Sequence, residues 1–403
     1  MRIIKVAAIN IALYTFFTLN PYFKWLLPNE YFYAFFLTTT FFLSFLLKKN
    51  VKNSFNFDFQ KKRTAIVLII FIIYFTTPIV HTFRWGHLVW ELPFLMIIFY
   101  NDRIINLGYF YFKKIMIWVA AFALFFWLLN ILKVPIPYYS FYPDFRIMSD
   151  DYYRIYGPAI SLYSGSLPVG GIYGIERITA VFAEPGHFGI YLGLTLAVEK
   201  FNFTSRDNKI LLIAGILTFS TAFMGILFLG LAYRFYLEKK LIKGILRIIS
   251  LMVVILLFGF ILGKGFNQLM FGRVFYKEDE QMNSITDLVE SRINERSINE
   301  FDQFTKTANY IFGVGYSEGV DMPTTNWRGV VYRFGIIGFF IIIIFLLSIV
   351  NRVDFFYALL LLLIAIIVLV HRSYFLYVPS VYMLIFLATG MHKQYSYSHF
   401  KPS

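Results

Sequence analysis

The stretch VVYRFGIIGFFIIIIFLLSIV, residues 330–350, decides the fold. It carries one charged residue, Arg333, in a run of apolar side chains. A helix that crosses the hydrocarbon core of a membrane needs ~20 such residues, and comparable stretches recur along the chain. The sequence therefore predicts an all-α polytopic membrane protein with about 12 transmembrane helices. We expect the spans at residues 3–23, 31–47, 64–83, 86–100, 115–134, 178–198, 210–219, 222–236, 245–262, 330–350, 355–370 and 374–391.

The composition excludes a soluble protein. Hydrophobic residues make up 59% of the chain and charged residues 15%, with a mean hydropathy of +0.65. A water-soluble domain has roughly 25% charged residues, so this chain cannot cover its surface with polar groups. The same figures exclude a long disordered tail, a coiled coil and a nucleic-acid-binding module, although the net charge is +14. The chain has no cysteine, which excludes disulfides, thiolate catalysis and thiolate metal sites.

The distribution of Lys and Arg sets the orientation, because short cytoplasmic loops carry an excess of these residues. With both termini in the cytoplasm, most Lys and Arg fall inside, and segments 135–176 and 264–328 become two sizeable outer loops that are net acidic. Lys209 and Lys239 are then both cytoplasmic, so residues 210–236 must cross the membrane an even number of times. We interpret this stretch as two short half-helices, 210–219 and 222–236. The whole chain, 1–403, would form one integral membrane domain.

Ionisable residues at membrane depth are costly and usually functional. Arg84, His87 and Glu91 are spaced i, i+3 and i+7, which places them on one face of a helix. An internal ion pair between Arg84 and Glu91 would explain this spacing, and so would a polar stripe that binds a ligand from the outer surface. The sequence leaves both interpretations open.

Arg177 and Glu184 lie seven residues apart around the expected span 178–198. Two helical turns would place them on one face, with Glu184 about 10 Å below Arg177 along the helix axis. Pro185 should kink the helix at this point, and His187 lies one turn beyond Glu184. Either a structural salt bridge or the wall of a cavity fits this pattern.

The outer side also gathers arginines, and their forked guanidinium groups recognise phosphate. Arg333 can instead snorkel to the surface, Arg372 can belong to a plain interfacial turn, and Arg292 and Arg296 can form the solvated face of an amphipathic helix within 264–328. Tyrosines of the first outer loop suit sugar rings but also occur in interfacial belts. Neither outer loop contains Asp-x-Asp, so we expect no metal and no cofactor. The outer arginines are Arg84, Arg177, Arg292, Arg296, Arg328, Arg333 and Arg372.

The run Arg177-Ile-Thr-Ala-Val-Phe182-Ala-Glu184-Pro185-Gly-His-Phe-Gly189 resembles the Arg-x4-Phe-x-Glu-Pro-x3-Gly signature of bacterial O-antigen and capsule repeat-unit polymerases. These Wzy-type proteins are related to the O-antigen ligases. The architecture is similar as well, with a medium first outer loop and a longer late one. The glycines of Gly313-Val-Gly315 and Gly335-Ile-Ile-Gly338, with Arg296, Asn309 and Asn326, look like the late loop of that family.

This resemblance implies a metal-independent glycosyltransferase of the bacterial inner membrane, with both termini cytoplasmic. It would polymerise repeat units into O-antigen or capsular polysaccharide on the periplasmic face. Undecaprenyl-diphosphate-linked oligosaccharide would be both donor and acceptor, and a chain-length regulator protein and a flippase would be partners. Glu184 and Arg177 would be catalytic. The substrate-binding set would be Arg84, His87, Glu91, His187, Arg292, Arg296, Asn326, Arg328 and Arg372.

Two alternatives stay open. O-antigen ligases typically carry a histidine before the late-loop asparagine, whereas Thr325 precedes Asn326 here. This departure favours a polymerase over a ligase, and it leaves the base unidentified. A flippase or transporter of lipid-linked oligosaccharide would also need internal cations and about 12 spans, but it would not need the long outer loop 264–328.

Overall fold

The computed structural model describes residues 2–26, 29–76, 85–142, 151–164, 167–168, 177–240, 295–315, 327–372 and 379–398, with positions 242, 244, 246 and 250. The chain divides into two compact units. The first consists of Met1–Thr18, Leu27–Lys113 and Ile293–Ser403, and the second consists of Leu19–Leu26 and Lys114–Arg292.

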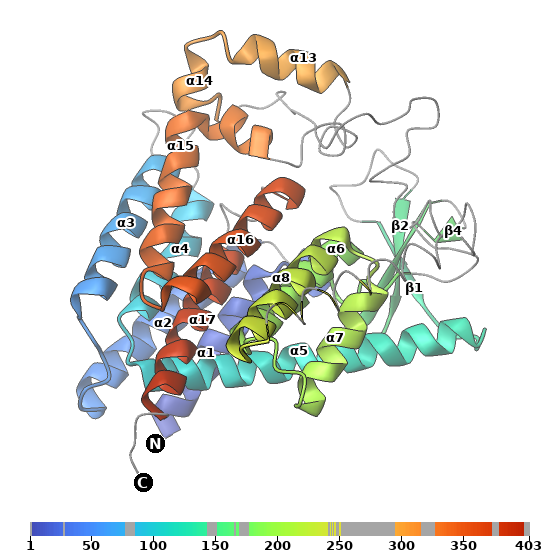
Figure 1. The fold of residues 1–403 in the computed structure, drawn as a ribbon, viewed down its shortest axis with the longest axis horizontal. Coiled ribbons are helices and arrows are strands. Elements are labelled where there is room, and N and C mark those ends of the chain that lie inside the picture. The colour runs from blue at the N-terminus through green and yellow to red at the C-terminus, as the bar shows by residue number, and fades with distance from the viewer. Residues whose placement is uncertain are drawn as a thin grey trace. The chain divides into compact units, whose positions relative to one another are not determined.

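The first unit is a helical bundle (Figure 1). Helix α2 packs on α1 and α4, α3 packs on α4 and α15, and α15 also packs on α16 and α17. Phe345 lies at the centre, with ring contacts to Phe71, Phe94 and Tyr382. The helices are α1 (Arg2–Thr18), α2 (Asn29–Asn50), α3 (Phe59–Thr76), α4 (Trp85–Ile98), the start of α5 (Asp102–Ile131), α13 (Glu295–Phe304), α14 (Asn309–Phe312), α15 (Trp327–Val350), α16 (Phe355–Arg372) and α17 (Pro379–Ser398).

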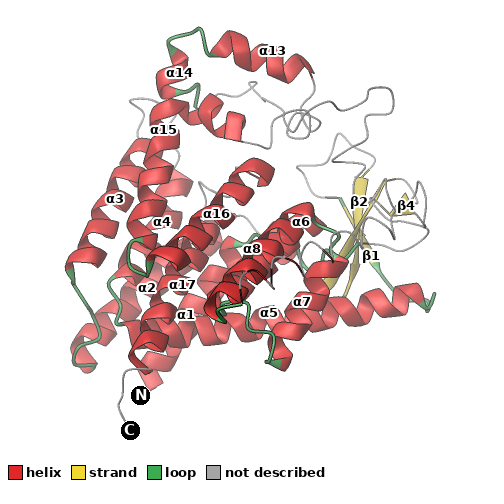
Figure 2. Ribbon diagram, viewed as in Figure 1, coloured by secondary structure: helices red, strands yellow, loops and turns green. Residues whose placement is uncertain are grey.

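The second unit combines helices with a small sheet (Figure 2). Its helices are η1 (Tyr22–Leu26), the rest of α5, α6 (Pro185–Val198), α7 (Arg206–Leu217) and α8 (Thr221–Leu237). The strands are β1 (Tyr139–Phe141), β2 (Asp151–Tyr156), β3 (Ala159–Ser164) and β4 (Leu167–Pro168), which form an antiparallel sheet in the order β1-β2-β3-β4. Gly157, with φ +60°, closes the β2–β3 hairpin, a conformation that suits glycine. The expected loop 135–176 therefore contains a small sheet that the sequence analysis does not predict, while the described chain is mostly helical as expected.

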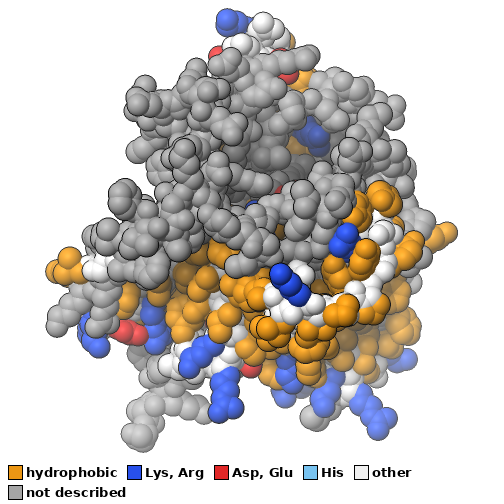
Figure 3. Space-filling model, turned by 90° about the vertical axis from the view of Figure 1, so that its right-hand side faces the viewer, with side chains coloured by type: hydrophobic (Ala, Val, Ile, Leu, Met, Phe, Trp, Pro, Cys, Tyr) orange, Lys and Arg blue, Asp and Glu red, His pale blue; other side chains and the backbone are white. Residues whose placement is uncertain are grey.

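The helices are those of a membrane-embedded protein. Among the described residues, Tyr31–Asn50, Asp102–Ile131 and Trp327–Val350 are long and apolar enough to cross a membrane. A helix occupies part or all of each expected span except 245–262, which lies almost entirely outside the described residues. Exposed hydrophobic side chains cover a broad area of the face in Figure 3, and Lys and Arg side chains gather along its lower border. The count of about 12 spans stays a prediction.

Helix α15 is broken at Gly335, where the late loop packs against it. Gly335 has φ 67° and ψ 178°, and Gly313 has φ 84°. The backbone N–H groups of Val314 and Gly315 donate to the carbonyls of Tyr332 at 2.9 Å and Arg333 at 2.8 Å. Gly313 and Gly335 thus let the backbone of residues 313–315 pack directly against the backbone of α15.

Replacing Gly335 with alanine should destabilise the protein by more than about 1 kcal/mol. The backbone of Gly335 has a positive φ that disfavours alanine, and its surroundings leave no room for a side chain. An added Cβ would lie 2.2 Å from the carbonyl oxygen of Ile311. Gly390→Ala is the matched control, since its nearest neighbours would be 3.5 Å away. Thermal unfolding of the two variants in the same detergent tests this, and equal melting temperatures would contradict it.

Candidate functional site

The segment from Arg177 to Glu184 is not helical, so the expected helix face shared by these two residues is wrong. Residues 177–184 form extended and turn structure, and α6 begins at Pro185. Proline suits the first position of a helix, and it holds the preceding residue extended. Glu184 accordingly is the N-cap of α6, with φ −144° and ψ 150°. The Glu-Pro pair therefore marks a helix start, which we had interpreted as a kink.

Three neighbouring elements fix this segment within the second unit. The N–H of Tyr22 in η1 donates to the carbonyl of Val181 at 2.8 Å. The hydroxyl of Thr179 donates to the carbonyl of Ile160 on β3. The hydroxyl of Tyr153, which is fully buried on β2, donates to the carbonyl of Ala183 at 2.9 Å. The backbone next to Glu184 is therefore held by the sheet.

The helix is interrupted between α7 and α8, at the expected place near Ser220-Thr221, and their role as half-helices in the membrane stays a prediction. Thr218 is the C-cap of α7, Phe219 has a left-handed φ of 47°, and the Ser220 hydroxyl accepts from the N–H of Phe223 at 3.4 Å at the start of α8. Arg177 lies at this break. Its Nε donates to the carbonyl of Thr218 at 2.9 Å and its Nη2 to the carbonyl of Phe219 at 3.1 Å. A cation is favoured there because the last carbonyls of a helix carry partial negative charge.

Helix α6 packs against the same break through two glycines four residues apart. A Cβ on Gly189 would lie 2.8 Å from Cβ of Ser220, and one on Gly193 would lie 2.9 Å from Cγ2 of Ile226. Small residues at this spacing let membrane helices approach closely. Phe182 is fully buried and contacts the rings of Phe188 and Tyr191. Arg177 and Gly189 of the signature thus contact the break, while Phe182 packs against α6 and Pro185 begins that helix.

A small pocket opens beside Arg177. Its volume is about 40 Å³, which holds a few waters or one small polar group but not a sugar ring. Arg177, Asn130 and Ser161 contribute polar atoms, and Trp127 and Tyr156 contribute aromatic rings. Our sequence analysis missed Asn130, Ser161 and Trp127, because only the fold brings α5 and β3 beside Arg177.

Lys24 is a further residue that sequence reasoning missed. It lies in η1, the helix that binds Val181 through Tyr22, and it is 4% exposed. Burial lowers the pKa of Lys24 from 10.5 to about 7. A lysine with such a pKa can carry either protonation state near neutral pH, as general acid–base chemistry requires. Its place right after the expected span 3–23 was the available signal.

The other predicted residues are distributed between the two units. His187 lies in the first turn of α6, in the second unit with Arg177 and Glu184. Glu91 lies in the first unit, on α4, and is 2% exposed with no hydrogen bond to its carboxylate in the described part of the chain. Arg328 begins α15, with its guanidinium carbon 5.8 Å from the ring centre of Phe301. Phe301 belongs to α13, which overlaps the end of the predicted amphipathic helix.

Several predicted residues cannot be placed. Arg84, Arg292 and Asn326 lie outside the described residues, so the proposed Arg84–Glu91 ion pair stays a prediction. Three more predicted residues lie in helices, but the structure describes only their backbone. They are His87 in α4, Arg296 in α13 and Arg372 in α16.

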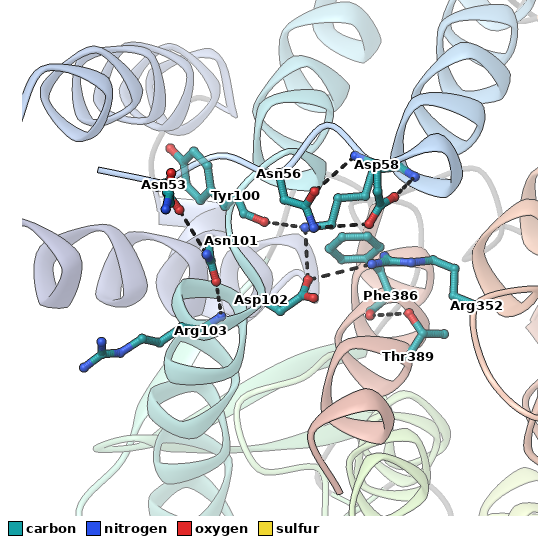
Figure 4. Close-up of polar contacts among 11 residues, drawn as sticks. Asn53, Asn56, Asp58, Tyr100, Asn101, Asp102, Arg103, Arg352, Phe386 and Thr389 are labelled. Atoms are coloured by element: carbon teal, nitrogen blue, oxygen red, sulfur yellow. Dashed lines mark hydrogen bonds and ion pairs between the residues drawn. The ribbon is translucent and has the colours of Figure 1, made fainter. Parts of the chain in front are cut away.

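The first unit contains a separate buried ionic cluster (Figure 4). Lys61 Nζ donates to the carbonyl of Tyr100 at 2.5 Å and lies 3.0 Å from Oδ1 of Asp102. Arg352 Nη2 lies 3.8 Å from the same oxygen, and its guanidinium carbon is 4.9 Å from the ring centre of Phe386. Both cationic side chains are fully buried, while Asp102 is 32% exposed. Asp102 thus joins α3, α5 and the turn after α15.

Asp102→Asn should lower the free energy of unfolding by about 3 kcal/mol, because it removes the carboxylate that pairs with two buried cations. Arg103→Ala is the control, since Arg103 is the next residue and its side chain is exposed. Thermal unfolding in detergent measures both. Equal melting temperatures for the two variants would show that the cluster does not stabilise the bundle.

The arrangement in the second unit combines a guanidinium, a carboxylate and a histidine at the start of α6 and the α7–α8 break. A guanidinium in a site with little water can stabilise charge that develops on phosphate oxygens. A carboxylate or a lysine of low pKa can accept a proton from a hydroxyl. Comparisons with models of protein families, with curated proteins and with solved structures find no match.

Proposed function

We propose that this protein is a membrane glycosyltransferase that polymerises undecaprenyl-diphosphate-linked oligosaccharide repeat units into O-antigen or capsular polysaccharide on the periplasmic face of the inner membrane. One observation carries the proposal. Arg177 and Gly189, two residues of the signature, contact the broken helix pair α7–α8, and Arg177 also lines the small pocket. Glu184 starts the helix that packs on this break.

The reaction needs few groups from the protein. The bond between the sugar carbon and the diphosphate breaks, and the same carbon bonds to a hydroxyl oxygen of the acceptor unit. The diphosphate leaves with the electron pair, and Arg177 stabilises the charge that it gains. The acceptor proton passes to a base, for which Glu184 and Lys24 are the candidates from the second unit. A chain-length regulator protein and a flippase complete the proposed set of partners.

The test uses the purified full chain in lipid nanodiscs with lipid-linked repeat units. Formation of a ladder of longer lipid-linked glycans, without added metal or nucleotide, is the expected result. Transfer of glycan only to a lipid A acceptor would identify a ligase instead. Movement of the lipid-linked unit across a vesicle membrane without any new glycosidic bond would identify a transporter, and would contradict the proposal.

The proposed orientation can be tested by cysteine labelling, because the chain has no native cysteine that would also react. A cysteine in place of Tyr139, which is 66% exposed on β1, should react with a membrane-impermeant maleimide added outside. A cysteine in place of Lys52, which is exposed between α2 and α3, should react only after the membrane is opened. The reverse pattern would contradict the topology. Ser161, a natural choice from the sequence alone, is buried and unsuitable.

A further inference from the structure

One face of the small sheet carries a strip of tyrosines with an arginine at its centre. Ser140 on β1 pairs with Arg154 on β2, so the residues two positions away on each strand share that face. The ring of Tyr138 lies 5.8 Å from that of Tyr156, and the ring of Tyr142 lies 5.4 Å from that of Tyr152. We call Tyr138, Tyr142, Tyr152, Arg154 and Tyr156 the tyrosine strip.

Arg154 connects the two pairs of rings. Its guanidinium carbon is 4.4 Å from the ring centre of Tyr138 and 5.8 Å from that of Tyr152. Its Nη2 donates to the hydroxyl of Tyr152 at 3.1 Å. Cation–π contact orders the rings into a continuous surface. From Tyr152 to Tyr156 the strip is ~13 Å long by strand rise, which exceeds the size of a single sugar ring.

The opposite face of the sheet is packed at Tyr153, in the middle of β2. Tyr153 is fully buried there and donates to Ala183. The outer tyrosines of the strip remain accessible, since Tyr138 is 49% exposed and Tyr142 is 62% exposed. The strand that carries the strip is therefore held in place through Tyr153, which bonds to the backbone next to Glu184.

The strip is continuous with the pocket of Arg177. Tyr156 belongs to both, and Arg154 pairs across the β2–β3 hairpin with Ser161, which also lines the pocket. The pocket itself is too small for a sugar ring. A glycan whose reacting end lies at Arg177 must therefore extend elsewhere, and the strip is the adjoining surface.

We propose that the tyrosine strip binds the glycan portion of the substrate, with sugar rings stacked on the tyrosines and hydroxyl groups bonded to Arg154 and the tyrosine hydroxyls. This inference rests on the proposed function and extends it by assigning the glycan to a surface. The chemistry of the face favours a glycan over lipid acyl chains, because its described positions carry mainly Tyr, Ser and Arg, with Ala159 and Pro168 as the apolar exceptions. Ile155 and Phe141 belong to the other face.

The sheet provides a matched pair of variants. Tyr142→Ala removes an exposed ring of the strip, whereas Tyr139→Ala removes a ring of similar exposure, 66%, from the opposite face of the same strand. With lipid-linked repeat units in nanodiscs, Tyr142→Ala should raise KM for the glycan substrate about fivefold at unchanged kcat, as the loss of one aromatic contact allows. The product ladder should shorten accordingly. Tyr139→Ala should match the wild type in both measurements.

A binding measurement separates this proposal from the proposed function. A spin label on Tyr142→Cys in nanodiscs should be accessible to a water-soluble nickel complex. The lipid-free repeat oligosaccharide, released from the polysaccharide of the source strain, should protect it. Protection without any polymer from the wild type would support the strip and contradict the polymerase. Polymer from the wild type with equal KM for Tyr142→Ala and Tyr139→Ala would overturn the strip. A label accessible only to oxygen in the lipid phase would place the strip in the membrane and also overturn it.

Discussion

Arg177→Ala is expected to abolish polymer formation, by at least ~10²-fold, while the protein still inserts into the membrane. Arg177 lines the pocket, and no other arginine of the described residues does so. The same substitution uncovers the carbonyls of Thr218 and Phe219, and each buried carbonyl without a donor costs about 1–3 kcal/mol. Turnover in nanodiscs and thermal unfolding must therefore be measured on the same sample.

Two further variants separate the charge of Arg177 from its contact with the helix break. Gln can donate to one of the two carbonyls but has no charge, and Lys keeps the charge but cannot form the two-pronged contact. We expect both to lose most of the activity, with smaller losses of stability than Ala. Full-length polymer from Arg177→Gln at normal expression would show that Arg177 only caps α7, and would remove it from the catalytic set.

The helix break near Ser220 could be predicted because it follows from topology. The predicted topology places the basic residues at both ends of 210–236 in the cytoplasm, which requires an even number of crossings, and Ser220-Thr221 interrupts the apolar stretch. The number of charges does not predict the backbone conformation of the break or its side-chain contacts, which the structure shows. Phe219 adopts a left-handed conformation, and the guanidinium that binds the carbonyls comes from Arg177, 41 residues earlier for Thr218.

The start of α6 could have been predicted and was not. Glu184-Pro185 carries two local signals for a helix start, the first-turn preference of proline and the extended residue before it. We gave precedence to the length of the apolar run 178–198 and read a kink. The consequence is chemical, because an N-cap carboxylate and a mid-helix carboxylate point in different directions relative to Arg177.

The small sheet and the ionic cluster lie beyond local sequence signals. Tyr152, Arg154 and Tyr156 alternate with Tyr153 and Ile155, so polarity does not alternate cleanly along β2. The cluster joins Lys61 to Asp102 and Arg352, which come from three separate parts of the sequence. Contacts between residues so far apart in the chain depend on how the helices pack, and local patterns in a single sequence do not predict that packing.

Glu184→Gln is the second large expected effect. The variant keeps the shape of the side chain and its position before Pro185, but it removes the ability to accept a proton. If Glu184 is the base, turnover should fall by ~10²-fold or more, the scale of lost general base catalysis. If Glu184 only orients Arg177, the loss should be milder, because Gln can still accept a hydrogen bond. Turnover with purified lipid-linked substrate distinguishes the two.

The control is Glu199→Gln at the other end of the same helix, where Glu199 is the C-cap of α6, and it should turn over normally. Binding of the lipid diphosphate should survive in Glu184→Gln, because Arg177 is unchanged. Loss of binding together with turnover would mean that Glu184 organises the pocket and is not the base.

Near-normal turnover by Glu184→Gln would leave Lys24 as the candidate base. Its pKa of about 7 predicts a rate that falls as pH drops below 7, since protonated lysine cannot accept a proton. A rate that is independent of pH in that range would exclude Lys24 as well, and would leave charge stabilisation by Arg177 as the main contribution of this site.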